Sequence, residues 1–263
     1  MKLSNIIKTE YEDVSEKVVS KVVSPKKMEK LKYKLMPGQN TYAKGVHALR
    51  DSYAQNEAEV PSHLWYNCDG QRIVRPLTFR ENLQARVDDF ETLKNKDGSI
   101  RTIEDRLRLF GTWFDSCTGI AYSSNNDDFM IIPMCKELIT IPRDFNDEYT
   151  QVDYASLQGK GFSLKRSQAK YDQQLTESEV ISHPAWFASV EEDVTLLCMY
   201  VSVVFKHMIN KDGKSMDFYL KDQIKKDQLM DLFVYGCNSN SIASGNVNLN
   251  FDGTSFLRAT PLS

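Results

Sequence analysis

The sequence predicts an α+β fold with a mainly helical body, a small antiparallel sheet and extended terminal arms. Apolar residues recur at helical spacing through most of the chain, an isoleucine-rich run occupies residues 128–142, and the C-terminal segment alternates apolar and asparagine residues. We therefore expect an amphipathic N-terminal helical segment over 1–37, a mainly helical body over 38–238, and a C-terminal arm or β-hairpin over 239–263.

Composition limits the classes of protein to consider. The 263 residues are 41% apolar and 26% charged, which is enough to bury a core without disulfides. Five widely spaced cysteines indicate reduced thiols, and the net charge of -3 gives no global attraction to nucleic acid or anionic lipid. No run approaches the roughly 18 apolar residues of a membrane span, so we expect no membrane span.

The N-terminal segment has a narrow apolar stripe that includes Val14, Val18 and Val22, which we take as candidate subunit contacts. A basic run, "PKKMEKLKYK", follows at residues 25–34. This run fits a phosphate or an acidic partner, and it equally fits the solvated face of a helix.

Two antiparallel helices are predicted at the start of the body. Thr78 and Glu81 form a capping-box pattern that opens a helix to about Leu93, and a second helix runs from near Thr102 through Trp113. The linker "KNKDGSIR" joins them and contains one of four Asn-x-Asp-Gly sequences. Turn chemistry explains all four sequences, because Asn and Asp form local side-chain hydrogen bonds and Gly supplies a positive φ. A calcium loop in this linker would need a carboxylate at the position of Leu93.

The next segment, "DSCTGIAYSSNNDD", is predicted to lead from the end of a helix into a strand. Gly119 is expected to end the helix, the polar run to form a turn, and residues 128–142 to be extended. Further along, Ser189 and Glu192 predict a second capping box, before a helix that is apolar on nearly all sides. An amphipathic helix is predicted over 215–235.

The C-terminal arm carries the remaining candidate subunit contacts. Val247, Leu249 and Phe251 alternate with asparagines, Asp252-Gly253 supplies a hairpin turn, and Phe256 lies on the returning run. An isolated hairpin is marginal in water. We therefore expect this one to dock on its own body or to extend a neighbour's sheet.

A catalytic site was tested around Asp115 and Cys117, with the acidic pair Asp127 and Asp128 as further candidates. A reactive thiol needs an electropositive environment, whereas Cys117 is expected to follow the C-terminal end of a helix. No cysteines or histidines have the paired spacing of a zinc site. We expect no catalytic residues, no cofactor and no metal.

The run "RLRLFGTWFDSCTGIAYSSNNDDFMIIPMCKELITI", residues 106–141, leads from a helix through an aromatic pair into a strand that ends in "IIP". In this it resembles a segment of virion structural proteins of short-tailed bacteriophages, of the head-to-tail connector or tail-tube type. The resemblance implies a helical subunit with extended arms, assembled as a ring around the DNA channel and without catalysis.

The sequence-based hypothesis is thus a non-enzymatic structural subunit of a large homo-oligomeric assembly, a phage head-to-tail connector or tail component. Its partners would be copies of itself and other virion proteins, with passive contact with DNA. Its location would be the virion, after assembly in the host cytoplasm. Two alternatives stay open: an enzyme with an unrecognised site around Asp115 and Cys117, and a small regulatory nucleic-acid-binding protein that uses segment 25–34.

Overall fold

The chain divides into two units, and the computed structural model describes twelve stretches of the larger unit, which spans Lys32–Pro261. These stretches are residues 32–35, 65–68, 71–74, 77–95, 97–111, 114–140, 150–169, 173–209, 216–221, 223–235, 241–244 and 257–260. The candidate subunit contacts Val14, Val18, Val22, Val247, Leu249, Phe251 and Phe256 lie outside these stretches.

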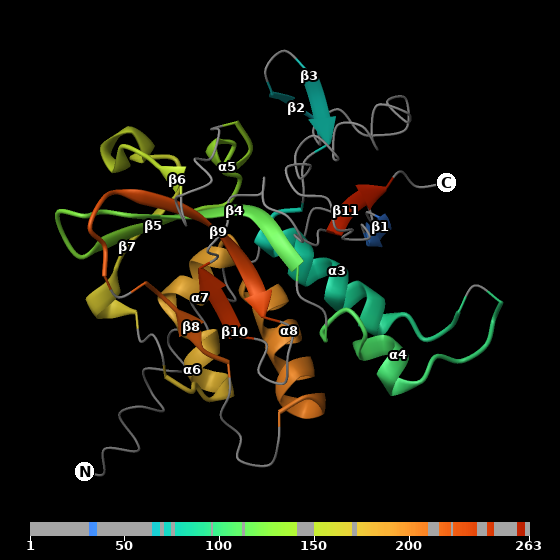
Figure 1. Ribbon diagram of the computed structural model, residues 1–263. Coiled ribbons are helices and arrows are strands. Elements are labelled where there is room, and N and C mark those ends of the chain that lie inside the picture. The colour runs from blue at the N-terminus through green and yellow to red at the C-terminus, as the bar shows by residue number, and fades with distance from the viewer. Residues whose placement is uncertain are drawn as a thin grey trace, which may run out of the picture. The chain divides into compact units, whose positions relative to one another are not determined.

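A seven-stranded sheet is the centre of the described part (Figure 1), with strand order β7-β5-β4-β9-β10-β8 and with β6 beside β9. Neighbouring strands are antiparallel except for β10 and β8, which are parallel. The strands are β4 Phe114–Tyr122, β5 Asp128–Ile132, β6 Thr150–Gln151, β7 Phe162–Lys165, β8 Phe218–Tyr219, β9 Gln228–Tyr235 and β10 Ser241–Ser244.

Two further antiparallel pairs stand outside this sheet. Strand β2 (Trp65–Cys68) pairs with β3 (Gln71–Val74), and β1 (Lys32–Leu35) pairs with β11 (Leu257–Thr260). Residues 257–260 of the C-terminal segment therefore form a strand, and their partner among the described residues is β1, which lies in the 1–37 segment that was predicted to be helical.

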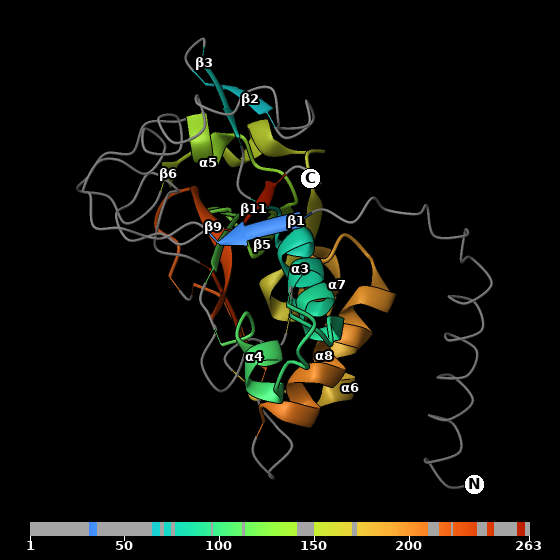
Figure 2. The ribbon, with the colours of Figure 1, turned by 90° about the vertical axis from the view of Figure 1, so that its right-hand side faces the viewer.

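The helices are α3 Phe79–Glu91, α4 Ile103–Leu107, α5 Glu137–Thr140, α6 Glu177–Ile181, α7 Pro184–Ser189 and α8 Val194–His207, with the 3₁₀ turns η3 Tyr154–Leu157 and η4 Arg166–Gln168. Figures 1 and 2 show α3, α7 and α8 close together on one side of the sheet. None of these helices in the described part is long and apolar enough to cross a membrane.

The main core lies between these helices and one face of the sheet. Alternate sheet residues such as Ile120, Phe129 and Met230 pack there with Trp186 and Tyr200 from the helices. Because side chains alternate along a strand, the intervening residues face the opposite side of the sheet.

That second face is also covered. Cys117, Met130 and Leu229 are fully buried there, and Cys135 and Leu138 at α5 are buried as well. Strands β4, β5 and β9 are therefore hidden on both faces, which explains their continuous apolar sequence.

Helix α3 begins as predicted. The Thr78 hydroxyl accepts a hydrogen bond from the Glu81 N–H at 3.2 Å, and Glu81 Oε2 accepts one from the Thr78 N–H at 2.8 Å, which completes the capping box. The helix also buries Arg86, whose Nη1 donates to the Leu109 carbonyl at 2.7 Å. Burial lowers the pKa of Arg86 from its ordinary value.

Several sequence-based predictions differ from the structure. The α+β class is confirmed, but a mainly helical body is not. The region predicted as a helix over 215–235 contains β8 and β9, and Gly119 lies inside β4 instead of ending a helix. The strand predicted over 128–142 ends at Ile132 and is followed by α5.

The region around α8 also departs from its prediction. Helix α8 buries one face and leaves Met199 37% exposed on the other, and its N-cap is Asp193. Ser189 instead closes α7, where its hydroxyl donates to the Ala185 carbonyl at 2.6 Å.

Candidate functional site: the α3–α4 hairpin

Residues 92–95 and 97–102, between α3 and α4, form the two sides of a β-hairpin, which we call the α3–α4 hairpin. The Arg101 N–H donates to the Leu93 carbonyl at 2.9 Å, and the Asn95 N–H donates to the Ser99 carbonyl at 2.8 Å. Lys94 and Ile100 lie opposite each other between these two bonds. Gly98, with φ of 86°, supplies the left-handed conformation that the turn requires.

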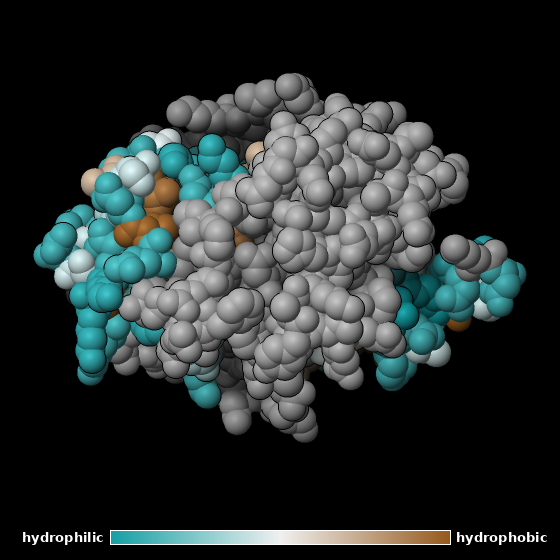
Figure 3. Space-filling model, turned by 45° about the horizontal axis from the view of Figure 1, so that its top comes forward, coloured by the Kyte–Doolittle hydropathy of each residue, from teal (hydrophilic) through white to brown (hydrophobic). Residues whose placement is uncertain are grey.

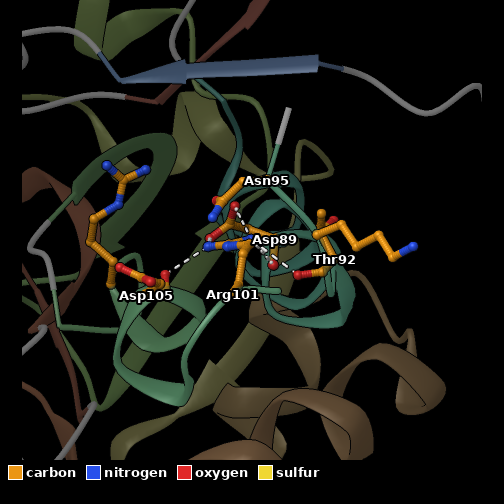
Figure 4. Close-up of a pocket in the computed structure, with 7 residues that line it drawn as sticks. Asp89, Thr92, Asn95, Arg101 and Asp105 are labelled. Atoms are coloured by element: carbon orange, nitrogen blue, oxygen red, sulfur yellow. Dashed lines mark hydrogen bonds and ion pairs between the residues drawn. The ribbon is translucent and has the colours of Figure 1, made fainter. Parts of the chain in front are cut away.

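Arg101 fixes the base of the hairpin (Figure 4). Its guanidinium donates to both carboxylate oxygens of Asp89, at 3.1 Å and 3.0 Å, and to the carbonyls of Asp89, Thr92 and Asp105, at 2.6, 3.3 and 2.6 Å. The last turn of α3 contains no basic residue. Arg101 therefore supplies the positive charge and the donors that carbonyls at a helix C-terminus need.

A second arginine, in the last turn of α4, connects this helix to the end of α3. Arg106 Nε donates to the Phe90 carbonyl at 2.6 Å, and its guanidinium lies 4.2 Å from the centre of the Phe90 ring. The Phe90 ring in turn meets Phe110 edge-on at 6.1 Å. The hairpin thus projects from a base that is connected to the main core.

The tip of the hairpin is held by local hydrogen bonds. Asp97 Oδ1 accepts from the Ser99 hydroxyl at 2.7 Å and from the Ser99 N–H at 2.9 Å, and Asn95 Nδ2 donates to the Ser99 hydroxyl. These bonds to Ser99 lower the pKa of Asp97 below its ordinary value. This geometry is the Asx-type turn that the Asn-x-Asp-Gly sequence predicts.

An open hollow of about 460 Å³ lies at the base of the hairpin, lined by Asp89, Thr92, Lys94, Asn95, Arg101, Asp105 and Arg108. Asp89 pairs with Arg101, and Asp105 Oδ2 accepts hydrogen bonds from the N–H and the hydroxyl of Thr102. The lining has three cationic and two anionic side chains, and its carboxylates are engaged within the protein. The hollow therefore favours an anionic group over a cation.

Three exposed aliphatic side chains belong to the hairpin and to the first residue of α4. Ile100 is 81% exposed, Leu93 58% and Ile103 37%. In Figure 3 the hairpin lies at the right-hand edge as a hydrophilic lobe with a small apolar area. Leu93 and Ile100 lie on opposite faces of the hairpin, because Leu93 is adjacent to Lys94, the residue that pairs with Ile100, and successive side chains of a strand alternate. Ile100 is therefore the exposed aliphatic side chain on the Lys94 face.

The structure does not assemble the predicted catalytic residues. Cys117 is fully buried in β4, whereas Asp127 lies in the β4–β5 turn, beyond the other end of the strand. The Ser167 side chain and N–H lower the pKa of Asp127 by hydrogen bonding, and Asp128 pairs with Lys165 at 2.9 Å. The backbone of Asp115 pairs with Phe233, and its side chain lies outside the described part.

Among the residues that the structure describes, no group of three or more His, Cys, Asp or Glu side chains could hold a metal ion. His183 caps α7 by accepting a hydrogen bond from the Trp186 N–H at 3.4 Å, and its ring stacks on Phe218.

The architecture is similar to the C-type lectin fold. The similar solved structure is described as "Accommodation of massive sequence variation in Nanoarchaeota by the C-type lectin fold"; the TM-score is 0.54 at 13% identity, over 88% of this chain and 99% of that chain. At this identity the likeness shows the fold alone. No protein-family model and no curated protein matches the sequence.

This likeness corrects the family resemblance drawn from residues 106–141. The resemblance to phage head-to-tail connector or tail-tube proteins is wrong, since the fold is that of a different class. The phage-related properties that this resemblance implied, among them the ring around a DNA channel, are therefore not supported.

Sequence reasoning missed Leu93, Lys94 and Ile100 as surface residues. The signal was the pair of aliphatic residues that flank the polar turn in "LKNKDGSI", because a solvated turn normally consists of polar residues.

Proposed function

We propose that this protein is a non-catalytic recognition protein, in which a C-type lectin-like scaffold presents the α3–α4 hairpin to another macromolecule. The observation that carries this proposal is the exposure of Ile100, 81%, on a hairpin whose base is fixed by Arg101 and Arg106. A rigid base lowers the entropic cost of binding, so an exposed aliphatic side chain there is well placed as an anchor.

The separation of core and hairpin supports this proposal. Helix α4 contributes no buried residue, and Lys94 and Ile100 lie on the surface, so substitutions at these positions leave the core packing intact. The similar structure is described as accommodating massive sequence variation in the same fold. A scaffold of this kind can change its binding surface without loss of folding.

A non-catalytic role also agrees with the position of Cys117. The thiol is fully buried, so a substrate cannot reach it without opening of the sheet. The alternative of a nucleic-acid-binding protein rests on segment 25–34, and the hypothesis of a homo-oligomeric subunit rests largely on the terminal segments. Most of these residues lie outside the described part, and both ideas stay predictions.

Photo-crosslinking in the cells that produce the protein tests the proposal. A benzophenone amino acid is placed at position 100, and a matched control carries it at Ser202 on the exposed side of α8. The proposal predicts a discrete adduct with another macromolecule from position 100 alone. Equal adducts from both positions, or none from position 100, would contradict it.

A further inference from the structure

We infer that the partner of the α3–α4 hairpin is an acidic segment of another protein, with a carboxylate that pairs with Lys94 and an apolar side chain that packs on Ile100. This inference rests on the proposed function and adds the chemistry of the partner. It depends on three observations: the charge of the hairpin, the pairing of its side chains, and the size of its apolar area.

The charge of the hairpin is opposite to that of the whole chain. The sequence from Leu93 to Thr102, "LKNKDGSIRT", contains three cationic residues and one acidic residue, a net charge of +2 in a chain of net charge -3. Arg101 is engaged by Asp89, and the Asp97 carboxylate accepts from Ser99. Lys94 has no ion pair with any residue of the described part, so its ammonium is available to a partner.

The register of the hairpin places Lys94 beside Ile100. These two residues form the non-hydrogen-bonded pair between the bonds of Arg101 to Leu93 and of Asn95 to Ser99. In such a pair the side chains lie on the same face of the hairpin, with Cβ atoms roughly 5 Å apart. A partner that covers this face must therefore present a carboxylate and an apolar group next to each other.

The apolar area indicates a short segment of a different protein instead of a second copy of this chain. Leu93 points to the other face of the hairpin, so the apolar area beside Lys94 consists mainly of Ile100 and is far smaller than the ~800 Å² per partner that stable interfaces bury. Two copies would also bring two positively charged hairpins together. Aliphatic anchors do not stack on bases as aromatic side chains do, which disfavours a nucleic acid.

A titration of the full-length chain with two synthetic peptides tests the inference. The acidic probe is acetyl-Leu-Glu-Ile-Asp-Leu-Glu-amide, and the neutral probe, acetyl-Leu-Gln-Ile-Asn-Leu-Gln-amide, has the same shape without the charge. Binding is followed by NMR, through the Ile100 methyl signal and the Lys94 amide signal. We expect saturable shifts with the acidic peptide that weaken as salt is added, and none with the neutral peptide.

Variants separate the two contacts. Lys94→Glu is expected to weaken the acidic peptide about fivefold or more by replacing attraction with repulsion. Ile100→Ser is expected to weaken it about tenfold through loss of apolar burial. The matched controls are Lys225→Glu and Met134→Ser, which alter an exposed lysine and a half-exposed methionine elsewhere. They should change the affinity less than about twofold.

Equal binding of both peptides, or binding of neither, would overturn the inference. Stronger binding of a ten-residue oligothymidine at the same signals would also overturn it, in favour of a nucleic-acid partner. The crosslinking experiment distinguishes this failure from failure of the proposed function. An adduct from position 100 without peptide binding removes only the acidic partner, whereas absence of that adduct removes the recognition role itself.

Discussion

Replacement of Gly119 by alanine should destabilise the protein, because the second face of the sheet leaves no room for a methyl group. A Cβ at Gly119 would lie 2.8 Å from Cys135 Cβ, 2.9 Å from Cys135 Sγ and 3.0 Å from Leu229 Cδ1. The Cys135 Cβ cannot rotate away, so the backbone after β5 must shift. Overpacking of this kind costs about 1–3 kcal/mol, and it outweighs the roughly 0.5–1 kcal/mol that a strand gains when glycine is replaced.

We therefore expect the free energy of unfolding to fall by about 1–2 kcal/mol in Gly119→Ala and by more in Gly119→Val. Urea denaturation followed by circular dichroism measures this change. The control is the same substitution in a Cys135→Gly background, where the two closest atoms are absent and the added cost should be smaller. An unchanged unfolding free energy in Gly119→Ala, or an equal loss in both backgrounds, would refute the packing argument.

Three further predictions concern the hairpin base, a strained turn and a hydrogen-bonded carboxylate. Arg101→Leu should cost about 2–3 kcal/mol of unfolding free energy, because five hydrogen bonds are lost around a side chain that is only 8% exposed, and urea denaturation checks it. A loss below about 0.5 kcal/mol would contradict the role of Arg101. Glu192 has a φ of 63°, which glycine adopts without strain. Glu192→Gly should therefore raise the free energy of unfolding by about 1 kcal/mol, and with it the melting temperature, whereas Glu192→Ala should raise neither. Burial acts to raise the pKa of Asp227, but hydrogen bonds from Ser124 and the Tyr154 N–H outweigh it, and the pKa lies below its ordinary value. The stability from Asp227 is therefore present above the unfolded value of about 3.9 and is lost as pH falls from there through the folded value; Asp227→Ala should make unfolding less sensitive to pH in that range, and an identical acid profile would contradict this.

Local signals in the sequence predicted the parts of the fold that depend on local contacts. The capping box of Thr78 and Glu81 forms within one helical turn, so the start of α3 could be identified from four residues. The hairpin turn around Asp97 and Gly98 is similarly determined by its own side chains.

Strand β9 and the part of β4 before Gly119 were predicted as helix because both strands are buried on both faces. A strand that packs on one side alternates apolar and polar residues, whereas β9 reads "QLMDLFVY", a nearly continuous apolar run that also fits a buried helix. Its central position between β4 and β10 decides the conformation, and those pairings come from distant parts of the sequence.

The candidate site could be predicted only in part. The lysines and the turn of "LKNKDGSI" were visible, but Arg101 reaches Asp89 across twelve residues, and this pairing follows from the folded positions of α3 and α4. The exposure of Ile100 likewise depends on the direction in which the hairpin projects, which no local pattern determines.

The most direct test of recognition through the hairpin is the affinity of the purified protein for the partner captured by crosslinking. It is measured for the wild-type chain and for a variant with Leu93→Ser, Lys94→Ser and Ile100→Ser. The comparison requires that the two proteins have the same unfolding free energy. If the hairpin is the recognition surface, affinity falls at least about tenfold, or about 1.4 kcal/mol, while the variant remains folded. Unchanged affinity in the folded variant would contradict it.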